Sequence, residues 1–274
     1  MHNLVLSLLN LQLPYLQRRI TTTYEDGILV TAPRATGTHV TSGLRNASGV
    51  HWNVAWEHEW APRWVSRIDY IQKRGRDQAR FAALPSANGF DLEYNNSGRS
   101  RYRAVEFTLD RPIRTNLRIL ASYIYSTAKA RPPMSLDFPD AAVETVPLVP
   151  VEWNTPHRFV AWGYFPLPAE LSASFSVEAR SGFPFSAIDD LNRIAGGYND
   201  HSMPAHFVTN ASVEKEIPIP FNRNKRVAFR VGVTNLFNRF NPRFVDANVN
   251  SPYFMTFSDS SNRHFVARVR ILKK

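Results

Sequence analysis

The stretch Arg226–Leu236, which reads Arg-Val-Ala-Phe-Arg-Val-Gly-Val-Thr-Asn-Leu, alternates apolar with polar or small side chains. In an extended strand, successive side chains point to opposite faces. One face of this segment therefore suits lipid and the other suits water. Such a two-sided strand is what a transmembrane β-barrel requires. The apolar positions are Val227, Phe229, Val231 and Val233, and the polar ones are Arg226, Arg230 and Thr234.

The same alternation recurs through residues 45–274, which we predict to be a single barrel region. Residues 1–44 are poorly defined, although Leu13–Thr23 and Gly27–Pro33 could add one or two strands. Alternation with a period of two is the main sequence signal for a half-buried strand. It predicts nine strands, at Gly49–Trp60, Trp64–Lys73, Tyr102–Leu109, Leu117–Thr127, His157–Phe165, Leu171–Arg180, His206–Glu216, Arg226–Leu236 and Arg263–Leu272.

The connections between these strands alternate between short and long. The long polar segments are Gly75–Ser100, Ala128–Asn154, Ser181–Ala205 and Phe237–Asn262. Outer-membrane barrels have short periplasmic turns and long extracellular loops, whereas structureless loops of this length are uncommon in compact soluble domains. The sequence therefore predicts an all-β, antiparallel, up-and-down transmembrane β-barrel that is partial, with about 9–11 strands. A soluble β-sandwich is the alternative fold.

Composition narrows the possible partners and compartments. The 274 residues include 33 basic and 23 acidic side chains and no cysteine. The basic residues are scattered through the strands rather than gathered in one run, which argues against nucleic acid as a partner. Without cysteine the chain has no disulfide or thiolate chemistry. It also contains no apolar run of about 18 residues, so a helical membrane span is not expected.

The N-terminus contains an apolar stretch, Leu4–Leu13, of the length found in signal peptides. It lacks the basic n-region and the small-residue cleavage site of a secretory signal. We therefore expect any export information to lie outside this chain, which favours a fragment of a longer protein.

Aromatic side chains are concentrated where a membrane interface would need them. Tryptophan and tyrosine gather at the lipid-water boundary of membrane proteins. We expect this role, rather than sugar stacking, for two groups of residues. These are Trp52, Trp56, Trp60 and Trp64 around one predicted turn, and Tyr123, Tyr125, Trp162 and Tyr164 on later strands.

Four short motifs resemble the carboxy-terminal barrel half of TonB-dependent outer-membrane receptors, in the order of that family. The closest resemblance is to the subgroup with a carboxypeptidase-regulatory-like domain at its N-terminus. The motifs cover much of residues 45–272 and are Gly98–Arg103, Trp153–Phe159, Arg180–Ser186 and Thr234–Pro242.

This resemblance implies a 22-stranded barrel filled by an N-terminal plug, with a coupling segment that contacts TonB. Nothing in the chain resembles the plug or the coupling segment, so TonB would be reached only through N-terminal parts that this chain lacks. The implied partners are outer-membrane lipid and lipopolysaccharide, and a small-molecule nutrient such as an iron chelate, cobalamin or an oligosaccharide.

The sequence contains no common catalytic, cofactor-binding or phosphate-binding motif. The cluster His51, Glu57, His58 and Glu59 is not expected to bind metal, because only alternate residues of a strand share a face. We therefore predict no catalytic residue, cofactor or metal ligand.

Candidate ligand-binding residues lie in the outer loops and on the luminal face. The loop residues are Asp189, Asp190, Asp200 and His201, which could equally be ordinary solvated loop residues. The luminal residues are Arg230 and Arg268. With Arg226 and Arg270, they could line a path for acidic solutes or form structural ion pairs with carboxylates such as Glu178 and Glu216.

Three functional hypotheses follow from the sequence. The first is a receptor and transporter fragment that takes up a scarce nutrient and is not an enzyme. The second is a complete small outer-membrane barrel of about ten strands, a protease or phospholipase that uses His201 or Asp200. The third is a soluble β-sandwich that binds a partner or glycan.

Overall fold

The computed structural model describes residues 17–25, 28–86, 89–114, 117–131, 147–190 and 194–273. The predicted signal-like stretch Leu4–Leu13 lies outside these residues. Within them, no helix is long and apolar enough to cross a membrane. The secondary structure consists of strands, turns and loops.

The described residues form sixteen strands. They are β1 (Gln17–Glu25), β2 (Ile28–Val40), β3 (Ser48–Ala61), β4 (Trp64–Ser86), β5 (Gly89–Arg114), β6 (Leu117–Ala130), β7 (Val149–Pro150), β8 (His157–Leu167), β9 (Leu171–Arg180), β10 (Pro184–Phe185), β11 (His201–Ser202), β12 (His206–Ile219), β13 (Asn222–Thr234), β14 (Pro242–Val245), β15 (Phe257–Ser260) and β16 (His264–Lys273).

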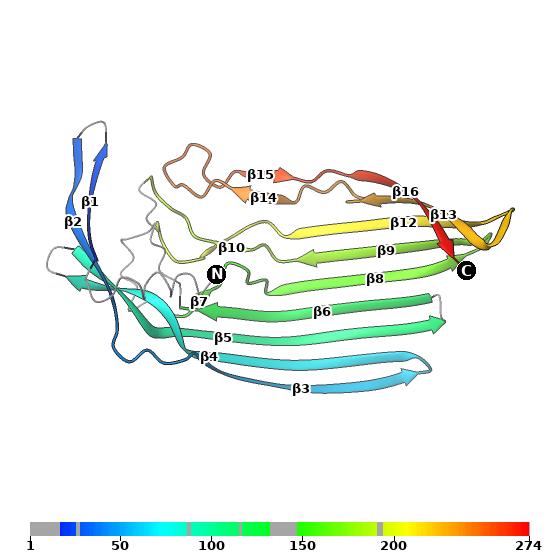
Figure 1. The fold of residues 1–274 in the computed structure, drawn as a ribbon, viewed down its shortest axis with the longest axis horizontal. Helices are drawn as coiled ribbons and strands as arrows, with labels where there is room; N and C mark the ends of the chain where they lie inside the picture. The colour runs from blue at the N-terminus through cyan, green and yellow to red at the C-terminus, as the bar shows by residue number, and fades with distance from the viewer. Residues whose placement is uncertain are drawn as a thin grey trace.

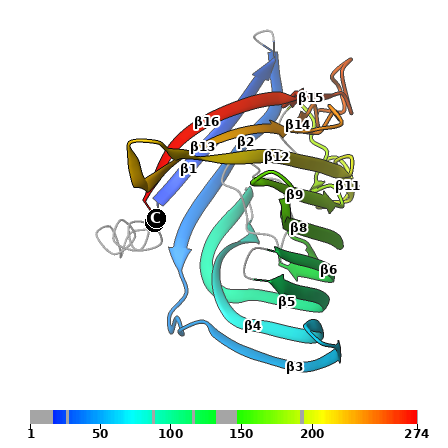
Figure 2. The ribbon, with the colours of Figure 1, turned by 90° about the vertical axis from the view of Figure 1, so that its right-hand side faces the viewer.

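Nine long strands form one continuous antiparallel sheet. Their order is β3-β4-β5-β6-β8-β9-β12-β13-β16. The nine predicted strands are confirmed, because each lies within or largely overlaps one of these. The sheet is curved but not closed (Figure 2). Among the described residues, β3 pairs only with β4 and β16 only with β13.

Short and long connections lie at opposite ends of the sheet (Figure 1). Residues 62–63, 168–170 and 220–221 make three of the short turns. The long connections after β6, β9 and β13 run through residues 131–156, 181–205 and 235–263. This confirms, for those three loops, the predicted alternation of short and long connections.

The register of the strands gives the sheet two chemically different faces. Residues directly opposite one another in antiparallel strands share a face. Ile68 pairs with Phe107, which pairs with Tyr123, and Tyr123 pairs with Phe159. The apolar row continues with Phe175, Ala211, Val233 and Phe265 on β9, β12, β13 and β16. We call this the apolar face, and the opposite one the polar face.

The apolar side chains do not gather in a core. Apart from Pro184 and glycines, the buried apolar residues in the described part of the chain are alanines, whereas Val231 is 62% exposed and Phe265 is 75% exposed. A continuous exposed apolar surface marks contact with a partner or with lipid. The nine strands form a single sheet with this face uncovered, so the hypothesis of a two-sheet soluble sandwich is wrong.

The prediction that Gly75–Ser100 forms a loop is wrong. Residues up to Ser86 continue β4 and residues from Gly89 begin β5, so most of this segment is a long hairpin extension. Its arginine and asparagine side chains are compatible with strands, because backbone pairing between β4 and β5 stabilises the hairpin. Polar composition alone could not separate such an extension from a loop.

The first two strands depart from a purely antiparallel arrangement. Strands do form near Leu13–Thr23 and Gly27–Pro33, as β1 and β2, and they pair with each other antiparallel. However, β2 pairs in parallel with β5 through residues 35–40 and 89–94. The up-and-down order therefore holds from β3 onward, and the division at residue 44 stays a prediction.

Candidate functional site

The polar face of the sheet holds most of the charged and hydroxylated side chains that alternate with the apolar ones. The same strands form both faces, because successive side chains of a strand point to opposite sides of the sheet. Three features of this face bear on function: an ion-pair network on β3 to β6, a series of paired arginines, and a hollow on β9, β12, β13 and β16.

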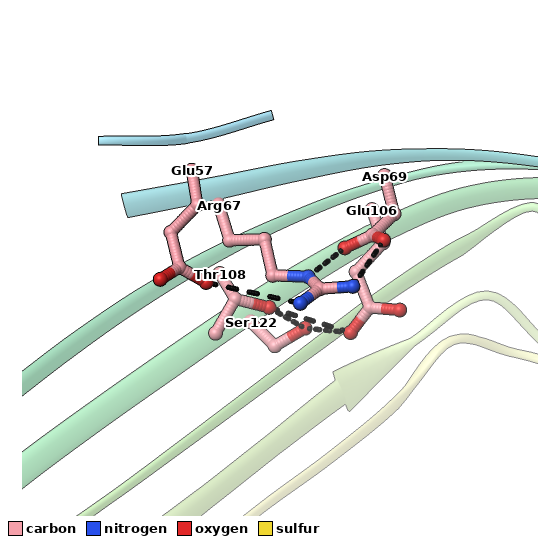
Figure 3. A network of polar contacts seen from close by, with 6 residues as sticks. All are labelled: Glu57, Arg67, Asp69, Glu106, Thr108 and Ser122. Atoms are coloured by element: carbon pink, nitrogen blue, oxygen red, sulfur yellow. Dashed lines mark hydrogen bonds and ion pairs between the residues drawn. The ribbon is translucent and has the colours of Figure 1, made fainter. Parts of the chain in front are cut away.

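The network on β3 to β6 is centred on Arg67 and Asp69 (Figure 3). Arg67 donates two hydrogen bonds to the Asp69 carboxylate, from Nε at 2.7 Å and from Nη2 at 2.8 Å. Its Nη1 lies 3.7 Å from Glu57. Ser122 donates to Glu106 at 2.9 Å. A bidentate arginine-carboxylate pair fixes the orientation of both side chains. Arg67 and Asp69 therefore have a structural role in this part of the polar face.

Most other arginines of the polar face also have carboxylate partners. The sequence left open whether Arg226 and Arg270 form structural pairs, and the structure shows that they do. Arg226 lies 3.2 Å from Glu216, and Arg270 lies 2.6 Å from Glu214. The remaining pairs of this kind join Arg118 to Asp110 and Arg158 to Glu178.

Arg230 and Arg268 differ from these arginines. They are direct partners across β13 and β16. The Arg230 side chain donates only to hydroxyl groups, to Ser212 at 2.9 Å and to Ser174 at 3.4 Å. The Arg268 side chain has no hydrogen bond or ion pair with any other described residue. The structure thus brings these two predicted residues together as a pair of cations that form no ion pair with a described carboxylate, although Glu214 lies opposite Arg230 on β12 and pairs instead with Arg270.

A hollow of about 340 Å³ opens beside this arginine pair. Gly232 leaves the space, since a Cβ there would lie 3.2 Å from the Cβ of Ser212. Its polar lining has hydroxyl, amide and guanidinium groups but no carboxylate among the described residues. Such a lining suits an acidic solute. The polar side chains around it are Ser174, Ser176, Asn210, Ser212, Arg230 and Arg268.

Sequence reasoning did not identify the serines of this hollow. Ser174 on β9 and Ser212 on β12 lie opposite each other, with their hydroxyl oxygens 2.8 Å apart. The run Leu171–Arg180 does place serine at every second position from Ser172 to Ser176. That signal marked a polar face, but only strand pairing shows which serines meet Arg230.

The predicted aromatic roles of Trp162 and Tyr164 are wrong. Trp162 pairs with Ser176, and Tyr164 pairs with Ser174, so both lie on the polar face. The guanidinium of Arg118 lies 5.6 Å from the centre of the Trp162 ring. Tyr123 and Tyr125 do lie on the apolar face, where an interfacial role remains the prediction.

The loop residues predicted as ligands hold the outer loops together. Asp190 accepts hydrogen bonds from the side-chain amides of Asn248 at 2.7 Å and Asn250 at 2.9 Å. These bonds join the loop of residues 181–205 to the loop of residues 235–263. The neighbouring Asp189 also has an interaction partner. These contacts give Asp190 a structural role within the loops.

Asp200 and His201 are neighbours with local contacts. Asp200 accepts a hydrogen bond from the backbone of Gly197 at 2.8 Å and lies 3.6 Å from His201. The imidazole of His201 stacks on Phe185, with ring centres 5.5 Å apart. No interaction in the described structure links this loop group to Arg230 or Arg268, so the six predicted residues fall into two separate groups.

Within the described residues, no group of three or more acidic, histidine or cysteine side chains is arranged to hold a metal ion. His58 instead packs between two tryptophans, with its ring 5.5 Å from Trp56 and 4.6 Å from Trp60. Glu59 accepts a hydrogen bond from the backbone of Arg63 in the adjacent turn. These two residues of the cluster around His51 therefore have structural contacts.

Asn199 is a loop residue that sequence reasoning missed. It has a left-handed backbone, with φ of 51°, and its side chain donates to the carbonyl of Pro150 at 2.7 Å. Its backbone N–H donates to Ser186 at 2.8 Å. Burial raises the pKa of its neighbour Tyr198. Asn199 thus ties the 181–205 loop to the segment after β6, a contact with no local sequence signal.

Replacing Asp190 by alanine should loosen the two outer loops without unfolding the sheet. The change removes both bonds to Asn248 and Asn250, and a hydrogen bond to a charged group contributes roughly 1.5–3 kcal/mol. We expect proteolysis within residues 235–263 to become several times faster. Limited digestion followed by mass spectrometry measures this, with Glu152→Ala, an exposed carboxylate in another long connection, as the control. Equal cleavage rates in the two variants would contradict the role of Asp190.

The fold was compared with known proteins. No family model matches the sequence, and no curated protein is significantly similar to it. Solved structures do match. The outer membrane transporter YddB from Escherichia coli is 14% identical, with a TM-score of 0.57 over 87% of this chain and 34% of that one. The ferric enterobactin receptor PfeA from Pseudomonas aeruginosa is 12% identical, with a TM-score of 0.58 over 87% and 33%.

The ferric-catecholate import receptor Fiu from E. coli is also similar, with 10% identity and a TM-score of 0.52 over 93% of this chain and 30% of that one. The sheet therefore has the fold of part of a TonB-dependent outer-membrane receptor barrel. The chain spans about a third of the length of these receptors. The subgroup with a carboxypeptidase-regulatory-like domain stays a prediction.

Proposed function

We propose that this chain forms the carboxy-terminal part of the barrel of a TonB-dependent outer-membrane receptor. The observation that carries the proposal is the division of nine strands into a mainly apolar and a mainly polar face. A barrel wall between lipid and a polar lumen needs this division on every strand. In this proposal the apolar face contacts outer-membrane lipid, and coupling to TonB belongs to segments that this chain does not resemble.

The open edges of the sheet support a place within a larger barrel. Strands β3 and β16 each have one unpaired edge among the described residues. In lipid, an unpaired backbone N–H or C=O group costs several kcal/mol, and closed barrels avoid this cost. Both edges would therefore pair with further strands in the complete receptor.

We propose an iron chelate as the transported nutrient. The matched PfeA and Fiu structures are described as receptors for ferric enterobactin and ferric catecholates. Ferric catecholate complexes carry negative charge, and neither arginine of the pair in the polar hollow forms an ion pair with a described carboxylate. Arg230 and Arg268 would therefore attract the chelate as it passes along the barrel wall.

Expression of residues 1–274 tests the membrane proposal. We expect β-structure by circular dichroism only when detergent or lipid is present, without the heat-dependent shift in gel mobility of a closed barrel, because β3 and β16 each leave one edge unpaired among the described residues. A folded monomer in plain buffer would contradict the proposal. Hydrolysis of peptides or lipids by the refolded chain, lost in His201→Ala, would instead favour the small-barrel enzyme.

Replacing Arg230 and Arg268 together by glutamine should weaken binding of a ferric catecholate at least about tenfold, because charge-assisted hydrogen bonds contribute roughly 1.5–3 kcal/mol each. Tryptophan fluorescence titration of the refolded chain measures the affinity. The control variant replaces Arg111 and Lys215 by glutamine and so removes the same charge. These two residues lie on the apolar face of the sheet. Similar losses in both variants would show that only net charge matters.

A further inference from the structure

Two exposed aromatic side chains lie on the polar face of the sheet. Trp162 and Tyr164 on β8 are 36% and 41% exposed. Their partners on β9 are Ser176 and Ser174, which line the polar hollow. In the described part of the nine long strands, every other exposed aromatic residue lies on the apolar face. We call Trp162 and Tyr164 the polar-face aromatic pair.

The Trp162 ring is oriented by a neighbouring cation. The guanidinium of Arg118 lies 5.6 Å from the centre of the ring, within the range of a cation-π contact. Arg118 is itself held by Asp110, to which it donates hydrogen bonds from Nε at 3.0 Å and from Nη2 at 2.5 Å. A side chain that is already oriented loses less conformational entropy when a ligand binds. The Tyr164 hydroxyl has no hydrogen-bond partner among the described residues.

The arginine pair of the hollow lies close to the polar-face aromatic pair. Arg230 on β13 reaches across β12, because its guanidinium donates to Ser212 at 2.9 Å and to Ser174 on β9 at 3.4 Å. Tyr164 on β8 lies directly opposite Ser174. Neighbouring strands are about 4.8 Å apart, so roughly one strand spacing separates this guanidinium from the strand that carries both rings. Cationic and aromatic groups therefore border the same part of the polar face.

The size and chemistry of the hollow limit what can bind there. Its volume of about 340 Å³ lies near the lower end of the range of roughly 300–1,000 Å³ for small-molecule sites. It suits one ring with its acidic group better than a complete ferric complex with several rings. Guanidinium groups pair with carboxylates, and aromatic rings pack favourably against other aromatic rings. An anionic aromatic ring satisfies both kinds of group.

We propose that the arginine pair and the polar-face aromatic pair together bind a single anionic aromatic ring, such as that of an aromatic carboxylate. The acidic group pairs with Arg230 and Arg268, and the ring packs against Trp162 and Tyr164. This inference rests on the proposed function in placing the polar face along a water-filled lumen. It goes beyond that function because the ring can be a free acid, without iron, as well as one ring of a chelate.

The test measures the affinity of the refolded 274-residue chain for benzoate by ligand-observed NMR titration in detergent. Cyclohexanecarboxylate is the matched ligand, because it has the same charge and nearly the same size but no aromatic ring. The first variant is Trp162→Leu with Tyr164→Leu. The control, Tyr123→Leu with Tyr125→Leu, removes two rings from the apolar face. A third variant, Trp162→Phe with Tyr164→Phe, keeps both rings, and circular dichroism checks the fold of each chain.

We expect the wild-type chain and the control to bind benzoate at least about fivefold more tightly than cyclohexanecarboxylate, because each aromatic contact contributes roughly a two- to tenfold factor. The leucine variant should lose this preference, and the phenylalanine variant should keep most of it. Replacing Arg230 and Arg268 by glutamine should weaken the binding of both acids. Equal affinity of the wild-type chain for the two acids would overturn the proposal. An unchanged preference in the leucine variant, or a lost preference in the control, would also overturn it.

A ferric tris-catecholate complex separates this inference from the proposed function. If the wild-type chain binds the complex but not benzoate, only the site for a free aromatic acid fails. If it prefers benzoate over cyclohexanecarboxylate but does not bind the complex, the site stands and the proposed nutrient fails. If the chain folds in plain buffer, the membrane proposal fails, and the same titration in buffer still decides the aromatic-acid site.

Discussion

Replacing Val231 by arginine should destabilise the membrane-inserted protein by about 2–4 kcal/mol, the cost of a cation on the lipid face of a barrel near the bilayer midplane. Val231 lies in the middle of β13 on the apolar face and is 62% exposed. Its neighbours across the strands are Val213 and Ala267. Urea unfolding of the chain refolded in lipid vesicles measures the change in free energy.

The matched control is Val266→Arg. Val266 is also exposed, at 48%, but it lies on the polar face opposite Gly232. A surface substitution in contact with water usually changes stability by less than about 0.5 kcal/mol. If both valines face water, both variants should be nearly neutral. Equal stability of the two variants would therefore contradict a lipid-facing surface.

Replacing Asn235 by alanine should cost about 3 kcal/mol or more, because a buried side chain with several hydrogen bonds is lost and each bond contributes roughly 1 kcal/mol. The Asn235 amide donates to the carbonyls of Arg239 and Ser261, both at 2.9 Å. Its side-chain oxygen accepts from the backbone N–H of Arg239. Asn235 also has a left-handed backbone, with φ of 51°. Thermal unfolding in detergent measures the loss.

Two further variants separate the causes of this effect. Asn235→Gly removes the hydrogen bonds but tolerates the left-handed backbone, so it should lose less stability than alanine. Asn238 shares the φ of 51° but is exposed, and its side chain accepts one hydrogen bond, from Arg263. Asn238→Ala should therefore cost less than Asn235→Ala. An equal cost at both positions would show that backbone conformation alone matters.

Asn235 and Asn241 show how far local sequence reasoning extends. The sequence predicts that a strand ends at Leu236 and that a long loop follows, and β13 does end nearby, at Thr234. The structure adds that the side chain of Asn241 bonds to both the N–H and the C=O of Phe207 on β12. That contact joins residues 34 positions apart, so nothing near either residue in the sequence indicates it.

The sequence by itself determined the strands and the chemical character of their faces, because the two-residue period of a strand is a local property. Val227, Phe229, Val231 and Val233 lie on one face whatever strand is paired with them. Where both faces carry aromatic residues, as in His157–Phe165, the local pattern was ambiguous. Trp162 and Tyr164 were therefore assigned to the wrong face.

Only the tertiary structure decided which side chains meet across strands, because register depends on pairing between distant segments. Register places Arg230 opposite Arg268 and aligns Arg74, Arg101 and Lys129 in one row. It also decided that the polar stretch after Gly75 continues as a hairpin, since pairing between the backbones of β4 and β5 is not visible in local composition. The proposed ligand-binding arginine pair therefore depends on strand pairing, whereas the two-faced wall that carries it follows from the sequence.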